Sequence, residues 1–161
     1  MRVLCFGSLN IDYTYRVDHF VRKGETLSSD SLQVFSGGKG LNQSIALAKA
    51  GASTYIAGAV GKDGGFLLDM LRSAGVDTSN VEVLPDIRTG NAIIQNDKEG
   101  DNCILLYGGA NQAITREQID EVLSKFQEGE FLILQNEINE LPYLVEKAHE
   151  RGMRIVLNPS P

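Results

Sequence analysis

The sequence predicts an α/β fold in which helices flank a mainly parallel sheet. Short apolar runs that are typical of buried strands alternate along the chain with stretches that have the spacing of amphipathic helices. The chain has 161 residues, of which 42% are hydrophobic and 22% charged, and this suits one ordinary folded domain with a sizeable core. We therefore expect residues 1–161 to belong to a single domain.

Two sets of strands are predicted. The main sheet is expected to contain the apolar runs at residues 3–6, 55–59, 131–134 and 155–157. Shorter strands at 13–17, 90–95 and 103–107 lie beside turn residues, and a plausible hairpin turn separates the last two. These shorter segments predict a small sheet outside the main one, with strands near residues 12–17, 32–36, 89–96 and 102–107.

Helical spacing recurs between the strands of the main sheet, near residues 41–52, 66–75, 115–123 and 139–152. Gly51 stands where a helix needs a left-handed residue after its last turn. Thr115 begins a Thr-Arg-Glu-Gln run of capping-box form. Asp63 and Asn139 are interpreted as residues that cap the amino-terminal ends of helices.

Charge and composition exclude some classes of partner. The formal charge of −6 argues against a nucleic-acid partner, which would need a basic stripe. No apolar run approaches the length of a transmembrane helix, so no membrane partner is expected. The chain begins with a strand rather than a secretory signal, which predicts a cytoplasmic protein. Cys5 and Cys103 are interpreted as buried thiols.

A glycine-rich run at residues 36–42, Ser-Gly-Gly-Lys-Gly-Leu-Asn, precedes the first predicted helix. It does not fit a Walker A loop, because Gln33 and Gly40 stand where that motif needs a glycine and a serine or threonine. The dinucleotide fingerprint also fails, since Gly7 is the one glycine directly after the first strand. The run could simply be a tight turn that leads into a helix.

The neighbouring side chains favour a site for a small polyol. Asp12 accepts hydrogen bonds, Asn10 and Asn42 both donate and accept, and Lys39 donates, which together matches the hydroxyl groups of a sugar. Glu137 follows an apolar strand at a position where open α/β sheets bind ligands. Asp12 and Glu137 could also form a carboxylate pair of glycosidase type, because the sequence does not fix their separation. The two histidines have no spacing typical of a metal site, so none is predicted.

Successive motifs of this chain resemble those of the ribokinase-type, or phosphofructokinase-B type, carbohydrate kinase family. The segments that carry the resemblance are Gly-Ser-Leu-Asn-Ile-Asp at 7–12, Gly-Glu-Thr at 24–26, Gly-Gly-Lys-Gly-Leu-Asn-Gln at 37–43, Gly-Lys-Asp at 61–63, Gly-Gly-Ala-Asn at 108–111, Leu-Gln-Asn-Glu at 134–137 and Asn-Pro-Ser-Pro at 158–161. Within the family, the first and third of these are most similar to ribokinase. The resemblance implies a ribokinase-like α/β domain whose small sheet is a lid over the sugar, with this chain as its amino-terminal half.

The resemblance also implies roles for individual residues. The sugar, with ribose favoured, would be bound by Asn10, Asp12, Gly38, Lys39, Asn42, Ala92, Ile94 and Glu137. The resemblance implies that the complete enzyme is a phosphotransferase that uses ATP and Mg²⁺, with a monovalent cation as a further candidate. The family's Gly-Ala-Gly-Asp run, which supplies the catalytic Asp and binds the transferring phosphate, is not in this sequence, so no catalytic residue is predicted here and the chain alone is expected to be inactive. The lid pairs in dimers of the family, and a homodimer or a complementary carboxy-terminal segment is expected. The alternative is a non-catalytic sugar-binding or interaction module.

Overall fold

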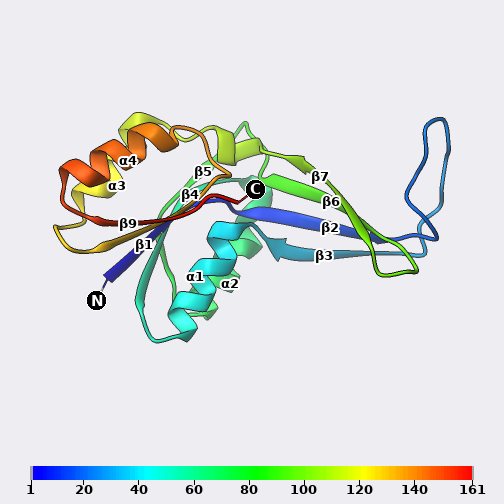
Figure 1. The fold of residues 1–161 in the computed structure, drawn as a ribbon, viewed down its shortest axis with the longest axis horizontal. Helices are drawn as coiled ribbons and strands as arrows, with labels where there is room; N and C mark the ends of the chain where they lie inside the picture. The colour runs from blue at the N-terminus through cyan, green and yellow to red at the C-terminus, as the bar shows by residue number, and fades with distance from the viewer. Residues whose placement is uncertain (1, 161) are drawn as a thin grey trace.

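The larger of two sheets contains five parallel strands in the order β5-β4-β1-β8-β9 (Figure 1). The computed structural model describes residues 2–160, so Met1 and Pro161, the ends of the predicted domain, lie outside the described residues. The five strands are β1 (Arg2–Phe6), β4 (Ser53–Gly61), β5 (Asp77–Leu84), β8 (Phe131–Gln135) and β9 (Arg154–Asn158). The four apolar runs predicted for this sheet all lie in it.

Strand β5 was not predicted, and its composition explains why. It lies at an edge of the sheet, and its inward positions Thr78 and Asn80 are polar. Asn80 is buried, and its Oδ1 accepts a hydrogen bond of 2.9 Å from Lys125 Nζ, which offsets the cost of burying this polar group. A polar edge strand of this kind lacks the apolar run that identifies a central strand.

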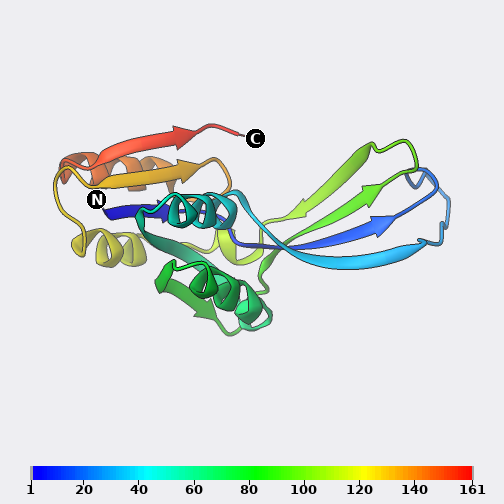
Figure 2. The same ribbon diagram turned by 90° about the horizontal axis from the view of Figure 1, so that it is seen from below.

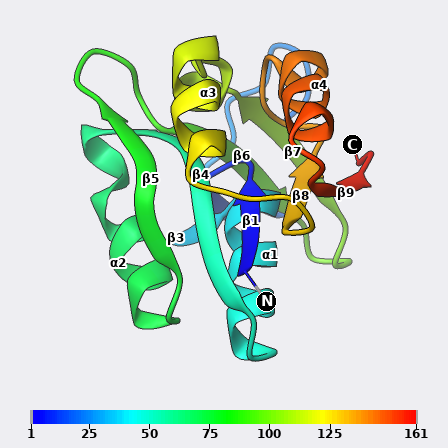
Figure 3. The same cartoon turned by 90° about the vertical axis from the view of Figure 1, so that its left-hand side faces the viewer.

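Two helices cover each face of the larger sheet (Figure 3). Helices α1 (Lys39–Lys49) and α2 (Gly65–Ser73) pack on one face, where Leu9, Ile56 and Leu71 belong to one apolar cluster. Helices α3 (Arg116–Ser124) and α4 (Leu141–Glu150) pack on the other face, where a second cluster includes Phe6 and Leu132. This three-layer arrangement buries both faces of the central strand β1.

The predicted helix ends are partly correct. Gly51 has a φ of 88°, as expected for a glycine that ends α1, and Thr115 caps α3 by accepting a hydrogen bond from the backbone N–H of Gln118. The caps predicted for Asn139 and Asp63 are wrong. Asn139 pairs instead with both backbone groups of Ile114, and Glu140 holds the capping position of α4. Asp63 accepts hydrogen bonds from the backbone N–H and hydroxyl of Thr89.

The smaller sheet contains four strands in the order β3-β2-β6-β7 and extends away from the larger sheet (Figure 2). Its strands are β2 (Asn10–Arg16), β3 (Ser31–Gly37), β6 (Gly90–Asn96) and β7 (Asn102–Tyr107). The central pair is parallel and the two outer pairs are antiparallel. Strand β7 is exposed throughout, so the interpretation of Cys103 as a buried thiol is wrong, whereas Cys5 is buried in β1. An outer strand of a small sheet leaves its side chains in solvent even when they are apolar.

The two sheets meet where the site residues lie. The chain leaves β1 at Phe6 and enters β2 at Asn10, and it returns from β3 to the larger body through Gly37 and Gly38. This junction lies at the carboxyl end of the parallel strands, where open α/β sheets bind ligands. Within residues 2–160, none of the helices has both the length and the apolar character needed to cross a bilayer.

Candidate functional site

A cavity of about 350 Å³ lies at the junction of the two sheets. All eight residues that were predicted to bind a ligand line it, together with two apolar residues of β7 that were not predicted: Asn10, Asp12, Gly38, Lys39, Asn42, Ala92, Ile94, Ile104, Leu106 and Glu137. Segments far apart in the sequence therefore converge on one space, although the binding role of these residues remains a prediction.

The small sheet contributes one wall of the cavity through the alternation of its strands. Asn10 and Asp12 are two residues apart on β2 and so share a face. Ala92 on β6 is the neighbour of Asp12 on β2, and Leu106 on β7 is in turn the neighbour of Ala92. The wall therefore combines a carboxylate with an apolar surface that extends to the exposed edge of the sheet.

The opposite wall begins at the amino-terminal end of α1, and two glycines make this geometry possible. Gly38 has a φ of 94°, a left-handed conformation that side chains other than glycine rarely adopt. A Cβ at Gly40 would come within 2.6 Å of the Gly7 carbonyl carbon and the Ser8 nitrogen. The glycine-rich run is thus more than a flexible connection, because it lets α1 begin in direct contact with the turn that follows β1.

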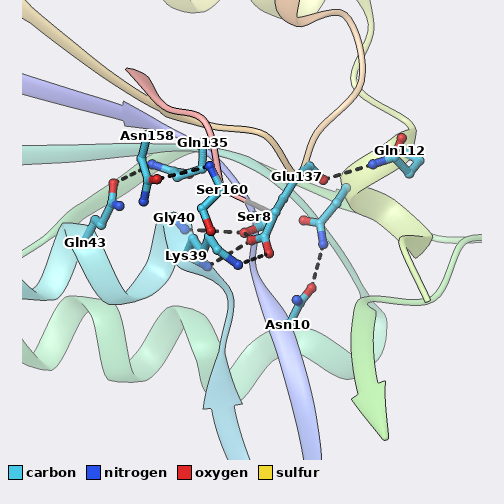
Figure 4. A network of polar contacts seen from close by, with 11 residues as sticks. Ser8, Asn10, Lys39, Gly40, Gln43, Gln112, Gln135, Glu137, Asn158 and Ser160 are labelled. Carbon is cyan, nitrogen blue, oxygen red and sulfur yellow. Dashed lines mark hydrogen bonds and ion pairs between the residues drawn. The ribbon is translucent and has the colours of Figure 1, made fainter. Parts of the chain in front are cut away.

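Glu137 is held at this end of α1 by groups that all donate to its carboxylate (Figure 4). Lys39 donates from Nζ to Oε1 at 2.7 Å and from its backbone N–H to Oε2 at 3.2 Å. The buried hydroxyl of Ser8 also donates to Oε2, and it accepts a longer contact of 3.4 Å from the Gly40 N–H. Ser8 therefore links the carboxylate to the helix end, a role that sequence reasoning did not assign to it.

The two carboxylates of the cavity differ in their electrostatics. Burial raises the pKa of Asp12, and the negative charge of Glu137 raises it further. Burial acts in the same direction on Glu137, but the hydrogen bonds from Lys39 and Ser8 outweigh it and lower the pKa of Glu137. The two carboxylates are therefore shifted in opposite directions, and the ionised form is more strongly stabilised at Glu137 than at Asp12.

The lowered pKa of Glu137 predicts a pH-dependent contribution to stability. Since the pKa is lower in the folded chain than the unfolded value of about 4.3, the stabilisation is present above that pH and is lost as the pH falls through the folded-state value. In urea unfolding from pH 7 to pH 3, the difference in free energy between the wild type and Glu137→Gln is expected to shrink below about pH 4.3. Glu121→Gln is the control, because the Glu121 side chain is 73% exposed. A Glu137 difference that stayed constant down to pH 3 would contradict the prediction.

Asn111 is a second residue that sequence reasoning did not place in the site. It lies in the short 3₁₀ helix η2 (Gly109–Gln112), is 2% exposed, and donates a hydrogen bond of 2.7 Å from Nδ2 to Oδ1 of Asn10. It was noted as part of a motif at residues 108–111, and its contact with β2 depends on a fold that brings together residues about 100 positions apart.

The cavity offers the means to recognise a ligand with several hydroxyl groups. Asp12 accepts, Lys39 donates, the amides of Asn10 and Asn42 add further polar groups, and Ile94 provides an apolar surface for carbon atoms. Among residues 2–160, no three or more His, Cys, Asp or Glu side chains gather where they could hold a metal ion.

Comparison with known proteins gives consistent results. A family model described as pfkB family carbohydrate kinase matches residues 1–154. Ribokinase of Staphylococcus aureus (strain COL) is 36% identical over 166 residues, which cover 99% of this chain and 54% of that protein. The chain spans about half the length of the curated relatives that it matches.

Solved structures agree with the sequence comparison. The ribokinase of Cryptococcus neoformans var. grubii serotype A in complex with ADP is 37% identical, with a TM-score of 0.82 over 98% of this chain and 49% of that one. The ribokinase of Arabidopsis thaliana complexed with ribose and ATP is 28% identical, with a TM-score of 0.78 over 96% of this chain and 52% of that one. The predicted ribokinase-like α/β fold, with its parallel main sheet and small mixed sheet, is confirmed.

Proposed function

Because the chain belongs to the pfkB family of carbohydrate kinases, we propose that it is the sugar-binding portion of an ATP-dependent kinase that phosphorylates a sugar hydroxyl, with ribose as the favoured sugar. The observation that supports this most strongly is the convergence of Asp12, Lys39, Asn42 and Glu137 on one cavity. A set of donors and acceptors around a partly apolar space suits a polyol, whose hydroxyl groups both donate and accept.

Each polar residue has a distinct role in the proposed complex. Asp12 accepts hydrogen bonds from sugar hydroxyls through its carboxylate oxygens. Glu137 accepts hydrogen bonds from the sugar through the lone pairs that Lys39 and Ser8 do not use. Lys39, whose Nζ is 2.7 Å from Glu137 Oε1, donates to the sugar with its remaining N–H groups. The backbone at Gly38 lets the sugar approach closely, since no Cβ stands in the way.

The apolar wall completes the binding mode. Ala92 and Ile94 contact the carbon face of the sugar from the small sheet, and Ile104 and Leu106 extend this surface. Covering the sugar in this way excludes water and strengthens the hydrogen bonds beneath it. The small sheet acts in this proposal as a lid.

Phosphoryl transfer depends on positioning both the acceptor and the nucleotide, with stabilisation of the charge on the transferring group. In the proposed complex, the residues of this chain bind and orient the acceptor. No proton transfer is assigned to Asp12 or Glu137, because both are committed to binding. ATP and Mg²⁺ would be bound by the other half of the kinase, so this chain alone is expected to show no kinase activity.

Calorimetric titration tests the proposed function. The chain is titrated with D-ribose, with fructose and ATP as comparisons. Binding of ribose without binding of ATP would support a separate acceptor site in this chain. If neither sugar binds, the cavity is not a sufficient sugar site and the proposal for the chain alone fails.

The exposed apolar surfaces lead to a proposal about partners. On β9, Val156 is 47% and Leu157 50% exposed, and both line a second, mostly apolar cavity of about 430 Å³ beside α1. On β7, Leu105 and Leu106 are 68% and 54% exposed. Surfaces of this kind are covered by another chain or segment in most soluble proteins, so a homodimer through the small sheet or a complementary segment along β9 is proposed.

Self-association of the isolated chain is the expected result. Sedimentation velocity over a range of concentrations should show species larger than the monomer, and Leu105→Lys should shift the distribution toward the monomer if the small sheet mediates contact. A compact monomer at high concentration would contradict this prediction.

A further inference from the structure

We propose that Asn111 is a positioning residue that fixes the side-chain amide of Asn10 with its N–H groups toward the cavity. The inference deepens the proposed function and rests on it in one respect, namely that the cavity binds a sugar. The inference makes the Asn10 amide a hydrogen-bond donor of the sugar site. Asn111, which does not line the cavity, sets the orientation of that amide.

The orientation of the Asn111 amide is fixed by the backbone of Leu9. The Leu9 N–H donates to Asn111 Oδ1 at 3.0 Å, and Asn111 Nδ2 donates to the Leu9 carbonyl at 3.3 Å. A backbone N–H can only donate and a carbonyl can only accept, so each contact independently requires the same orientation. Reversing the Asn111 amide would place two donors together and two acceptors together.

The orientation of Asn10 follows from that of Asn111. Asn111 Nδ2 is 2.7 Å from Asn10 Oδ1, and because Nδ2 carries only donors, the atom opposite it must be the oxygen of Asn10. The oxygen of Asn10 is thus used inside the protein. The two N–H groups of Asn10 are what this side chain can offer to the cavity that it lines.

The packing around the pair leaves little freedom to rearrange. Asn111 is 2% and Asn10 7% exposed. A Cβ on Gly90 would lie 2.1 Å from Asn111 Nδ2 and 2.5 Å from Asn10 Oδ1, so the glycine at this position makes room for the contact. The series of hydrogen bonds from Leu9 through Asn111 to Asn10 therefore determines that Asn10 presents donors, not an acceptor, to the cavity.

This polarity predicts a rule of specificity. The ligand group beside Asn10 must accept a hydrogen bond, whereas the group beside Asp12, on the same face of β2, must donate one. A hydroxyl satisfies either requirement. Fluorine, which can accept weakly and cannot donate, is tolerated beside Asn10 but not beside Asp12, and an ammonium group, which only donates, is excluded beside Asn10.

Asn111→Asp inverts the polarity with little change in shape. One carboxylate oxygen keeps the hydrogen bond from the Leu9 N–H. The other can no longer donate to the Leu9 carbonyl, and it faces Asn10, whose amide must then rotate to donate to it. The Asn10 oxygen now faces the cavity. Ribose still binds, because a hydroxyl can donate to this oxygen, but a fluorine at the same place meets an acceptor.

Calorimetry with 2-deoxy-2-fluoro- and 3-deoxy-3-fluoro-D-ribose measures the inversion. For one of the two analogues, the ratio of its affinity to that of ribose is expected to be about tenfold lower in Asn111→Asp than in the wild type, which corresponds to one hydrogen bond. Asn102→Asp, at an exposed position on β7, adds the same charge and should leave both ratios unchanged. Ratios that are the same in Asn111→Asp and the wild type for both analogues would overturn the inference.

A measurement on the unliganded wild type tests this inference independently of the proposed function. It does not depend on whether the Asn111 variant folds. In hydrogen-exchange NMR, the side-chain N–H₂ of Asn111 should be protected, since it is buried and hydrogen-bonded, and that of Asn10 should exchange faster. Protection of the Asn10 amide protons with fast exchange at Asn111 would overturn the inference, whether or not ribose binds. Absence of ribose binding with the expected exchange pattern would count against the proposed function alone.

Discussion

Asp12→Ala is expected to lower the affinity for ribose by about 100-fold or more, because hydrogen bonds to a charged group contribute about 1.5–3 kcal/mol each and a carboxylate can accept two from neighbouring hydroxyls. Burial raises the pKa of Asp12 because it disfavours the carboxylate form. Sugar hydroxyls that donate to the carboxylate would offset this cost, so the effect should exceed that of removing a neutral partner. Calorimetric titration of the variant measures the loss.

The matched control for this variant is Asp101→Ala, at an exposed position in the turn between β6 and β7. Its affinity for ribose should equal that of the wild type. The helical content of Asp12→Ala, measured by circular dichroism, should also be unchanged, because Asp12 lies on β2 and contributes to no helix. Unchanged ribose binding in Asp12→Ala would show that the sugar site lies elsewhere.

Gly40→Ala is expected to have the second large effect, here on stability. The new Cβ would come within 2.6 Å of backbone atoms of Gly7 and Ser8, a contact that can be relieved only by moving α1 away from the turn after β1. Overpacking of this kind costs about 1–3 kcal/mol, which for a chain of this size lowers the melting temperature by roughly 2–4 °C per kcal/mol. Thermal unfolding followed by circular dichroism measures the shift.

Gly65→Ala is the control for the substitution itself. Gly65 begins α2 with helical dihedral angles, and a Cβ there would have no neighbouring atom within 4 Å. This variant should be as stable as the wild type or more stable by up to about 1 kcal/mol. If Gly40→Ala melted at the same temperature as Gly65→Ala, the close approach of α1 to the turn would not be essential to the fold.

Much of the fold could be predicted because the central strands and the helix ends have strong local signals. Strands β1 and β8 are short apolar runs, and Gly51 marks the end of α1 through its left-handed conformation. Strand β5 lacked such a signal because its buried positions are polar and are satisfied by tertiary contacts such as that of Asn80 with Lys125. Asn139 was wrongly predicted to cap α4, because its actual partner, Ile114, is distant in the sequence.

The candidate site shows the same division. Residue chemistry at Asn10, Asp12 and Lys39 pointed to a polyol, and the structure places these residues around one cavity with the others that were predicted. Ser8 and Asn111 were not assigned roles, since a serine and an asparagine in glycine-containing turns have many possible functions and only the fold brings them to Glu137 and Asn10. Residues that act through another residue leave little trace in a single sequence.

The cavity takes one wall from the small sheet, with Asp12 and Ala92, and the other from the larger body, with Lys39 at the start of α1 and Glu137 after the end of β8. Figure 2 shows that the small sheet projects from the larger body and is joined to it at a narrow waist. A bound sugar would link these two lobes through hydrogen bonds on both sides of the waist, and it would therefore limit their motion relative to each other while it is bound. In the proposed complex, the contacts that hold the sugar would also restrain the two lobes relative to each other, so sugar binding would be coupled to the rigidity of the molecule.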